Sequence, residues 1–332
     1  MGTDEFDPVT DSVAIKPKAT NEGTNPLVLL GSARSGTTWL QDILAQSNGL
    51  RTIFEPLNPL GDGRAGPFAG RYLAPSDSVP ELREFLEEAI SGRGMRMWWD
   101  LRVPPSHVFR WQSPVGYAAQ ALYLSRGFRR YWRSRHQPRL TKIIRGNLIA
   151  GWIASSVRAR TLLLVRHPCA VVASQLRLDR TAWHDHDQLL HRYLEDERLV
   201  ADHLVGLREF LWGIRDPVEV HAALWCIENA IPMRTAPRNG VSLTFYEPLL
   251  VGDRGAWQEV LTSFGLTRAP TAAIMGTPSQ QASSEMKGSS FGRATIERWR
   301  ERFVPEQLHQ IRRMLDRFEM DRYSVDDAMP RS

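Results

Sequence analysis

A glycine-rich stretch near the amino end of the chain carries residues suited to holding a phosphate or sulfate group. Residues 31–36 read Gly-Ser-Ala-Arg-Ser-Gly, and Thr37, Thr38 and Trp39 follow them. Such a loop, placed between a strand and a helix, points backbone N–H groups at an anion. The sequence therefore predicts an anion-binding loop with the Arg34 guanidinium as its permanent positive charge.

The loop differs from the usual nucleotide-binding P-loop at one position. That motif places Lys directly after its second glycine and before a Ser or Thr. Here Thr37 follows Gly36, and the cation is Arg34 inside the loop. Without the lysine the loop is a poor choice for a β/γ-phosphate held with Mg²⁺. It suits a ligand with one terminal anionic group on the loop and a second phosphate elsewhere.

A second anion site is expected where another buried strand ends. Arg166 follows the apolar run Leu162–Val165, at the edge where open α/β sheets bind their ligands. Pro168 is placed to begin a helix, and Ser174 lies about two turns into it. An arginine at a strand end and a hydroxyl on the next helix predict a phosphate clamp.

Together the two motifs resemble those of sulfotransferases that use 3′-phosphoadenylyl sulfate (PAPS). Arg166-His167-Pro168 with Ser174 is similar to the family's 3′-phosphate motif, written Arg-Asp/Asn-Pro with a later Ser. The glycine-rich stretch is similar to its 5′-phosphosulfate loop. On this resemblance the donor-binding residues of the loop are Arg34, Ser35, Gly36, Thr37, Thr38 and Trp39.

Three further stretches resemble the family more loosely. Lys142 in Lys-Ile-Ile-Arg resembles a central-strand active-site lysine, and Tyr246 in Phe-Tyr-Glu-Pro-Leu resembles a tyrosine that contacts the nucleotide. Lys287-Gly288, with Trp299 downstream, resembles the C-terminal Arg-Lys-Gly loop. The resemblance runs from about residue 26 to about residue 320 and thins between 60 and 140.

The chain departs from the family pattern at three of these places. His167 replaces the acidic or amide residue of the 3′-phosphate motif. Phe245 replaces the arginine before the tyrosine, and Met286 replaces the arginine before Lys-Gly. Whether these positions take part in phosphate binding is a question for the structure.

Sulfuryl transfer to a hydroxyl needs a base, in-line positioning and positive charge at the leaving phosphate. The positive charge is expected from Arg34, Lys142 and the loop N–H groups. Cytosolic small-molecule members of the family place a His two residues after the strand lysine, where this chain has Ile144. Carbohydrate and tyrosylprotein members instead use a Glu after the second strand, and this chain has Glu55 at that position. Trp39, in contrast, matches the cytosolic members. We therefore expect Glu55 as the base; the alternative is a helix-capping or salt-bridged carboxylate.

The elements that must position these residues indicate a doubly wound α/β fold, with a parallel sheet between two helical layers in a three-layer α/β/α arrangement. Helical patterns separate most of the apolar runs, as βαβ units require. A further helix is expected from Pro305, with an apolar face through Phe318. The runs expected as strands are Leu27–Leu30, Arg51–Phe54, Leu140–Ile144, Leu162–Val165 and Val241–Phe245.

Domain organisation follows from composition along the chain. Residues 1–25 are polar and broken by Pro and Gly, which predicts a flexible tail. Residues 26–325 are expected to form one sulfotransferase domain, with an acceptor-side insertion at about 58–139. Arginines alternate with aromatic residues over 93–139, which either grip an acidic or sugar-containing acceptor or form a solvated basic helix face. A membrane surface or a nucleic acid is the remaining alternative for this region.

Composition limits the class of protein. The 332 residues include 42% hydrophobic ones, and the net charge of +5 suits anionic ligands without requiring a nucleic-acid partner. The chain has only two cysteines, Cys169 and Cys226, which favours a reducing compartment. Neither a signal peptide nor a membrane-length apolar run is visible, so a cytoplasmic location is expected. The run from His184 to Asp187 is a poor chelate because neighbouring residues on a helix point different ways, so no metal is expected.

The sequence thus predicts a PAPS-dependent sulfotransferase that needs no metal and acts on the hydroxyl of a carbohydrate or glycosylated metabolite. Phenolic, lipid and tyrosyl acceptors are alternatives, and the sequence does not indicate the oligomeric state. One rival is a drifted P-loop kinase, which would need a Lys after Gly36 and a Mg²⁺-binding Asp at a strand end. The other is a non-catalytic nucleotide-binding protein, against which Glu55 and Lys142 argue.

Overall fold

Five short strands, all parallel to their neighbours, form a sheet in the order β2-β3-β1-β4-β5. The computed structural model describes residues 25–92, 95–102, 114–177, 186–277 and 293–331. The α/β prediction is confirmed, and each expected strand forms within two residues of its expected ends. The strands are β1 (Leu27–Leu30), β2 (Arg51–Phe54), β3 (Arg139–Ile143), β4 (Arg160–Val165) and β5 (Val241–Phe245).

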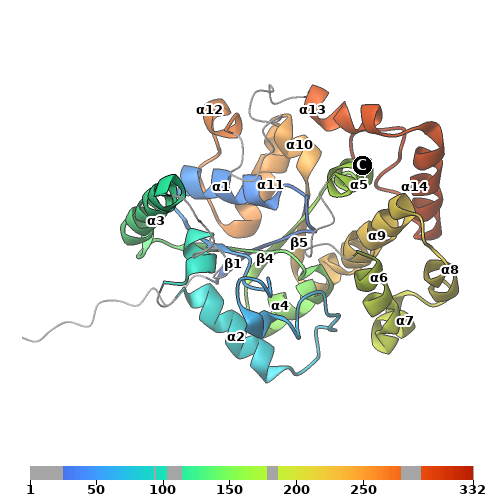
Figure 1. The fold of residues 1–332 in the computed structure, drawn as a ribbon, viewed down its shortest axis with the longest axis horizontal. Coiled ribbons are helices and arrows are strands. Elements are labelled where there is room, and N and C mark those ends of the chain that lie inside the picture. The colour runs from blue at the N-terminus through green and yellow to red at the C-terminus, as the bar shows by residue number, and fades with distance from the viewer. Residues whose placement is uncertain (1–24, 93–94, 103–113, 178–185, 278–292, 332) are drawn as a thin grey trace, which may run out of the picture.

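Helices cover both faces of the sheet, so the expected three layers are present (Figure 1). Alternate residues of β1 pack into two separate apolar clusters, with Val28 and Leu30 on one face and Leu27 and Leu29 on the other. The second cluster holds α1 (Thr37–Asn48) and α11 (Arg254–Phe264). The first holds α2 (Pro80–Ser91), α4 (Ala150–Ser156), α5 (Pro168–Leu176) and α9 (Pro217–Thr235).

The remaining helices lie around these layers. The longer ones are α3 (Pro114–Ser134), α6 (His186–Glu195), α7 (Glu197–His203) and α14 (Pro305–Arg317). The shorter α-helices are α8 (Arg208–Trp212), α10 (Tyr246–Leu250), α12 (Ala272–Met275) and α13 (Arg293–Glu297). Single turns of other helix types are η1 (Gly63–Ala65), η2 (Met97–Leu101), η4 (Asn147–Ile149), η5 (Pro237–Asn239) and η7 (Arg298–Arg302).

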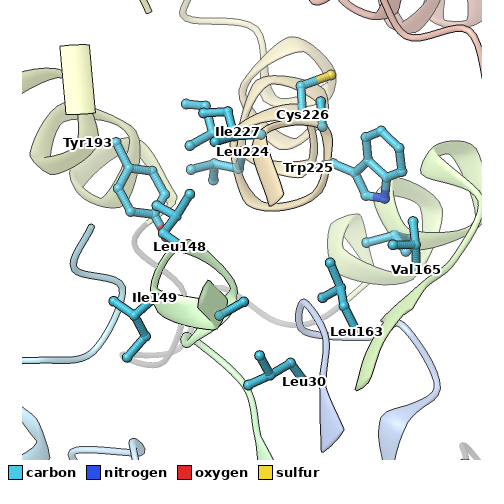
Figure 2. Close-up of a cluster of buried hydrophobic side chains, with 14 of the residues drawn as sticks. Leu30, Leu148, Ile149, Leu163, Val165, Tyr193, Leu224, Trp225, Cys226 and Ile227 are labelled. Atoms are coloured by element: carbon cyan, nitrogen blue, oxygen red, sulfur yellow. The ribbon is translucent and has the colours of Figure 1, made fainter. Parts of the chain in front are cut away.

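Helix α9 is fixed against the sheet by an apolar cluster that Figure 2 shows in close-up. Leu224, Trp225 and Ile227 of α9 belong to the same buried cluster as Leu163 and Val165 of β4. Burial of side chains of this size contributes about 1.5–3 kcal/mol each. The packing sets the position of α9 relative to the ends of the strands.

The segment between β2 and β3, where the acceptor-side insertion is expected, also contributes to the core. Helix α2 lies in it and buries five apolar side chains in the main core, so at least this helix is an ordinary crossover element. Those side chains are Leu82, Phe85, Leu86, Ala89 and Ile90. The helix expected from Pro305 forms as α14, with Ile311, Leu315 and Phe318 buried as its sequence pattern predicts.

Because the strands are parallel, their carboxyl ends meet at one edge of the sheet. The loop 31–36 follows β1, Glu55 follows β2, Arg166 follows β4 and Tyr246 follows β5. The predicted site residues thus gather at this edge. None of the helices in the described part of the chain combines the length and the hydropathy that a membrane crossing requires.

Gly31 is closely enclosed at this edge, by a side chain and by the backbone of the neighbouring strand β4. A Cβ atom there would lie 2.6 Å from Ser35 Oγ and 2.8 Å from the backbone oxygen of Leu164. We expect Gly31→Ala to lower the free energy of unfolding by about 1–3 kcal/mol, because the backbone oxygen cannot move aside cheaply. Urea denaturation measures this change. Gly63→Ala is the matched control, since nothing lies within 4 Å of its added methyl group; equal losses in both variants would contradict the steric explanation.

Candidate active site

The anion-binding loop has the backbone geometry that its sequence predicts. Arg34 and Gly36 adopt left-handed φ angles of 70° and 92°, and α1 begins directly afterwards at Thr37. Gly36, the residue before α1, has no side chain with which to cap the helix, and the start of a helix favours an anion. A Cβ at position 36 would lie 2.5 Å from the Tyr246 ring, so only glycine fits beneath that ring.

A buried ammonium group links this loop to the predicted base. Lys142 Nζ donates to Thr38 Oγ1 at 2.7 Å and pairs with Glu55 Oε1, also at 2.7 Å. It lies 4.1 Å from the centroid of the Phe54 ring, and the Lys142 side chain is 1% exposed. Burial lowers the pKa of Lys142, and the Glu55 carboxylate partly opposes this effect. Three elements thus bring together residues that sequence analysis chose separately.

Glu55 is held rigidly in an unusual backbone conformation. Its φ angle is 44°, in the left-handed region that non-glycine residues rarely adopt. Asn58 Nδ2 donates to Glu55 Oε2 at 3.1 Å, and Trp98 Nε1 donates to its backbone oxygen at 3.0 Å. Neither supporting residue is identifiable from the sequence. A salt-bridged carboxylate is the alternative that the sequence leaves open for Glu55, and the structure shows that ion pair; the role as base stays a prediction.

The two predicted phosphate motifs are in direct contact. Arg34 Nε donates to Ser174 Oγ at 2.9 Å, and Arg166 Nη1 donates to the backbone oxygen of Arg34 at 3.2 Å. The Arg166 guanidinium also lies 4.6 Å from the centroid of the Tyr246 ring. Burial lowers the pKa of Arg34, and the positive charges of Arg166 and Arg177 lower it further. Concentrated positive charge of this kind favours an anionic ligand.

Unpartnered polar atoms mark the same place. Ser35 Oγ, Arg166 Nε and Gln175 Oε1 are buried and have no hydrogen-bond partner within the described residues. Buried polar groups are nearly always paired, so such atoms indicate a polar ligand. Two of them are donors suited to phosphate or sulfate oxygens, and the third accepts a hydrogen bond. The residues therefore fit a nucleotide with anionic groups at two positions.

The two predicted aromatic contacts are enclosed by protein. Trp39 is 4% exposed, with its ring centroid 5.2 Å from Tyr246 and 6.1 Å from Trp257. Trp39 Nε1 donates to the backbone oxygen of Met275 at 3.4 Å. In this arrangement Trp39 and Tyr246 shape the loop, and their contact with adenine stays a prediction. Lys287 and Gly288 lie outside the described residues.

The departures from the family pattern have structural explanations where they are described. His167 is fully buried, accepts from the Cys169 N–H through Nδ1 and caps α5. Its Nε2 atom lies 2.8 Å from the backbone oxygen of Asp327, and its ring stacks on Trp299 at 4.7 Å. Phe245 packs against Tyr323, with their ring centroids 5.8 Å apart. Met286 lies outside the described residues.

Several polar residues at this edge were not chosen from the sequence. Arg145 follows β3 with a φ angle of 63°, and its buried Nη1 atom has no partner among the described residues. Tyr193 donates to Glu228 Oε1 at 3.0 Å, and burial raises the pKa of Glu228 to about 7. Asn229 Nδ2 donates to Ser32 Oγ of the loop at 3.4 Å. The position of Arg145 just after a strand is a sequence feature that could have identified it as a site residue. Nothing in the local sequence identifies Glu228 and Asn229 of α9 in the same way.

Backbone strain concentrates at this edge. Arg34, Glu55 and Arg145 all have positive φ angles, and each follows a different strand, β1, β2 or β3. Such conformations cost about 1–3 kcal/mol each and persist where the surrounding structure enforces them, typically at functional sites. Within the described ranges there is no group of three or more potential metal ligands. His186 packs against His221, while His184 and Asp185 lie outside those ranges.

Comparisons with known proteins add little to this geometry. No family model matches the chain, and a search of curated proteins found no significant match. Among solved structures, the sulfotransferase domain from the curacin biosynthetic pathway shares 15% identity at a TM-score of 0.42, covering 89% of this chain and 98% of that one. The sulfotransferase domain from the Synechococcus PCC 7002 olefin synthase shares 17% at 0.41, covering 92% and 99%. Likeness at this level leaves the activity to be argued from the chain's own residues.

The buried cap of α5 should make stability depend on pH. Burial lowers the pKa of His167 to about 4, below the ordinary value of 6.5. The unfolded state then binds the proton more readily, so this contribution is complete above pH 6.5 and is lost as the pH falls toward 4. The comparison variant is His167→Asn, whose amide oxygen preserves the cap but does not titrate. Between pH 7.5 and pH 5, the free energy of unfolding should fall by about 2 kcal/mol more in the natural protein than in this variant. Urea denaturation at both values tests this; equal falls would contradict it.

Proposed function

We propose that this protein is a PAPS-dependent sulfotransferase. The observation that carries the proposal is the shared Lys142 ammonium, which contacts Thr38 of the anion-binding loop and Glu55 at the end of β2. This contact supports the proposal, because the residues expected as base, cation and anion-binding loop meet at one edge of the sheet. The predicted second phosphate clamp, formed by Arg166 and Ser174, adjoins the same loop through Arg34.

The donor would be held at its two anionic ends. In this proposal the loop N–H groups, Ser35, Thr37 and Thr38 bind the 5′-phosphosulfate end, while Arg166 and Ser174 bind the 3′-phosphate. The unpartnered Ser35 Oγ and Arg166 Nε atoms support these assignments, because a bound oxyanion supplies what each lacks. Gly36, Trp39, Tyr246, Lys287 and Gly288 complete the proposed donor site on family resemblance.

The proposed transfer assigns one role to each charged group. Glu55 takes the proton from the acceptor hydroxyl as its oxygen forms a bond to sulfur. The bond between sulfur and the donor's bridging oxygen breaks, and negative charge develops on the leaving phosphate. Lys142, Arg34 and the loop N–H groups stabilise that charge. No step requires a metal ion, because fixed cations already stand at the loop.

The ion pair between Glu55 and Lys142 bears on how this reaction would begin. In this pair, Glu55 Oε1 already accepts a hydrogen bond from Lys142 Nζ. Donor oxygens at Thr38 would draw the Lys142 ammonium toward the loop and leave Glu55 Oε1 for the acceptor. Arrival of the donor would thereby prepare the base, which couples the two binding events.

The proposed acceptor is a small molecule or glycan bearing a hydroxyl group, and a carbohydrate or glycosylated metabolite is the first choice. Arg145, Glu228 and Asn229 bring a cation, a carboxyl and an amide to the same edge, which suits a molecule with several polar groups. Phenolic, lipid and tyrosyl acceptors are the alternatives. A cytoplasmic location and the absence of a nucleic-acid partner belong to the proposal.

A kinase is the less favoured assignment. A P-loop kinase uses a lysine after the second glycine to reach the β- and γ-phosphates. Thr37 occupies that place here, and Lys142 approaches the loop from β3 while paired with Glu55. A protein without activity would need no candidate base beside the anion-binding loop, whereas Glu55 supplies one here through its contact with Lys142.

Nucleotide binding tests the donor site. We expect 3′-phosphoadenosine 5′-phosphate to stabilise the folded protein and so raise its Tm. At a hundredfold excess over Kd, the free energy of unfolding should increase by about 2.7 kcal/mol. ATP should give a much smaller rise, because it lacks the 3′-phosphate that Arg166 and Ser174 would hold. Thermal denaturation with each nucleotide measures the difference. Equal shifts, or none, would remove the basis of the proposal.

Substitution of Arg166 identifies which residue reads the 3′-phosphate. Arg166→Ala should weaken binding of 3′-phosphoadenosine 5′-phosphate by about 1.5–3 kcal/mol, the range for hydrogen bonds to charged groups. Isothermal titration calorimetry gives the affinity directly. Arg208→Ala is the control, since this arginine pairs with Glu197 on α7 outside the proposed site. Unchanged affinity in the Arg166 variant would assign the 3′-phosphate elsewhere.

Glu55→Gln tests the base. The amide keeps the shape and an oxygen for Lys142 but removes the basicity, so kcat should fall about 10²- to 10⁴-fold. Affinity for 3′-phosphoadenosine 5′-phosphate should change little, and the acidic limb of the pH–rate profile should disappear. The assay follows PAPS turnover by mass spectrometry with pooled sugars, phenols, steroids and lipids as acceptors. Glu87→Gln on α2 is the control, and a Glu55 variant with near-natural kcat would refute the assignment.

A further inference from the structure

A second hollow lies along α1. Its volume is about 650 Å³, and its walls come from α1, α3 and the short helix α12, which lie next to each other in Figure 1. Trp39 borders one end, beside the anion-binding loop, and Leu50 borders the other, where α1 has ended. At about 1.5 Å per residue, this hollow follows α1 for roughly 16 Å. We refer to it as the α1–α3 groove.

Four arginines of α3 line the groove. Arg126, Arg129, Arg130 and Arg133 recur three and four residues apart, which places them on one face of the helix. Along the helix axis, Arg126, Arg129 and Arg133 are separated by about 5 Å each, and Arg130 lies beside Arg129. The spacing matches a ligand with repeated anionic groups better than one with a single charge.

Within the groove the acidic side chains are already paired. Asp42 pairs with Arg102 at 2.6 Å, and Asp100 pairs with Arg51 at 2.5 Å. Arg130 donates to the backbone oxygen of Asp100.

Three arginines of the row remain without a counter-charge. Across the described ranges, the structure records no hydrogen bond or ion pair for the guanidinium groups of Arg126, Arg129 and Arg133. The groove therefore presents uncompensated positive charge along one wall, and the arginines that carry this charge line the hollow.

The aromatic rings of the groove are not available for stacking. The Arg51 guanidinium lies over the Tyr131 ring, 4.6 Å from its centroid. Trp39 is enclosed by Tyr246 and Trp257. Single-stranded nucleic acids are held largely by bases stacked on free aromatic faces, which these rings do not offer.

Uncharged polar side chains complete the lining. They are the amides of Gln46 and Gln137 and the hydroxyl groups of Thr52, Ser134 and Thr277. Amides and hydroxyls both donate and accept hydrogen bonds, so they suit a ligand rich in hydroxyl groups. The lining thus combines a row of anion-binding groups with partners for sugar hydroxyls.

We propose that the α1–α3 groove binds an extended oligosaccharide that carries several sulfate groups. The arginines bind the sulfates through paired N–H donors, and the amide and hydroxyl side chains bind the ring hydroxyls. The groove meets the proposed donor site at Trp39 and otherwise runs along α1 away from it, and the inference does not depend on the proposed transfer reaction.

Calorimetric titration of the full chain with a heparin-derived hexasaccharide tests the proposal. We expect one-to-one binding that weakens as salt is added, since the contacts are mostly ionic. Saturating 3′-phosphoadenosine 5′-phosphate should leave the affinity unchanged, because the nucleotide would occupy the other site. Failure to bind at low salt would overturn the proposal. Competition with the nucleotide would also overturn it, by placing the sugar at the anion-binding loop.

A triple variant assigns the binding to the groove. Replacing Arg126, Arg129 and Arg133 together by alanine should weaken hexasaccharide binding by about tenfold, as expected for three partly screened ion pairs. The control replaces Arg83, Arg208 and Arg331 by alanine, which removes the same charge at exposed ion pairs elsewhere. The control should stay within about twofold of the natural protein. Equal weakening in both variants would show only unspecific charge attraction and overturn the assignment.

Other polyanions provide the specificity test. The unsulfated hexasaccharide should not bind measurably, and oligo(dT) of similar charge should bind more weakly than the sulfated sugar. Oligo(dT) binding as tight as the sulfated sugar would assign the groove to nucleic acid. Phosphatidylserine vesicles that bind through the same three arginines, while the sugar does not, would assign it to a membrane surface. Either result would overturn the proposal, and neither bears on nucleotide-induced stabilisation.

Discussion

The buried Lys142 ammonium is the constraint on which the carboxyl edge of the sheet depends. An ammonium group with 1% exposure must be paired, because desolvation of a lone charge costs far more than the fold can supply. Thr38 on α1 and Glu55 after β2 provide the partners, and Phe54 lies against the charge. Each of these contacts fixes a different element. Satisfying one cation therefore sets the loop, the end of β2 and the start of α1 relative to one another.

A second set of contacts ties the other half of the edge to the same loop. Arg34 bonds to Ser174 on α5, and Arg166 bonds back to the carbonyl of Arg34. Burial and then the repulsion from the nearby Arg166 guanidinium lower the pKa of Arg34. An anion between them would relieve that repulsion and satisfy the unpartnered Arg166 Nε. The α1–α3 groove likewise carries positive charge that no carboxylate among the described residues compensates.

His167 shows how a departure from a motif can be accommodated without loss of architecture. The family pattern has an acidic or amide residue there, whose side chain can cap the following helix. The imidazole Nδ1 supplies an equivalent acceptor to the Cys169 N–H, and the ring is enclosed by Trp299 and Tyr323. Burial keeps the imidazole neutral, as capping requires. The substitution thus belongs to the packing of α5 and the C-terminal segment, and the predicted phosphate contact of this motif rests on its neighbour Arg166.

The sequence by itself determined the strands, the loop and the order of the motifs, because these depend on local apolar runs and on residues adjacent in the chain. The apolar runs before Gly31 and before Arg166 can be recognised as strands without knowing which elements they pack against. Only the tertiary structure decided which polar groups meet. Asn58 and Trp98 support Glu55, and Tyr193 meets Glu228, through contacts between separate elements that no spacing encodes. Likewise, the arginines of α3 read as a basic helix face, and only their position opposite α1 made them one wall of a groove.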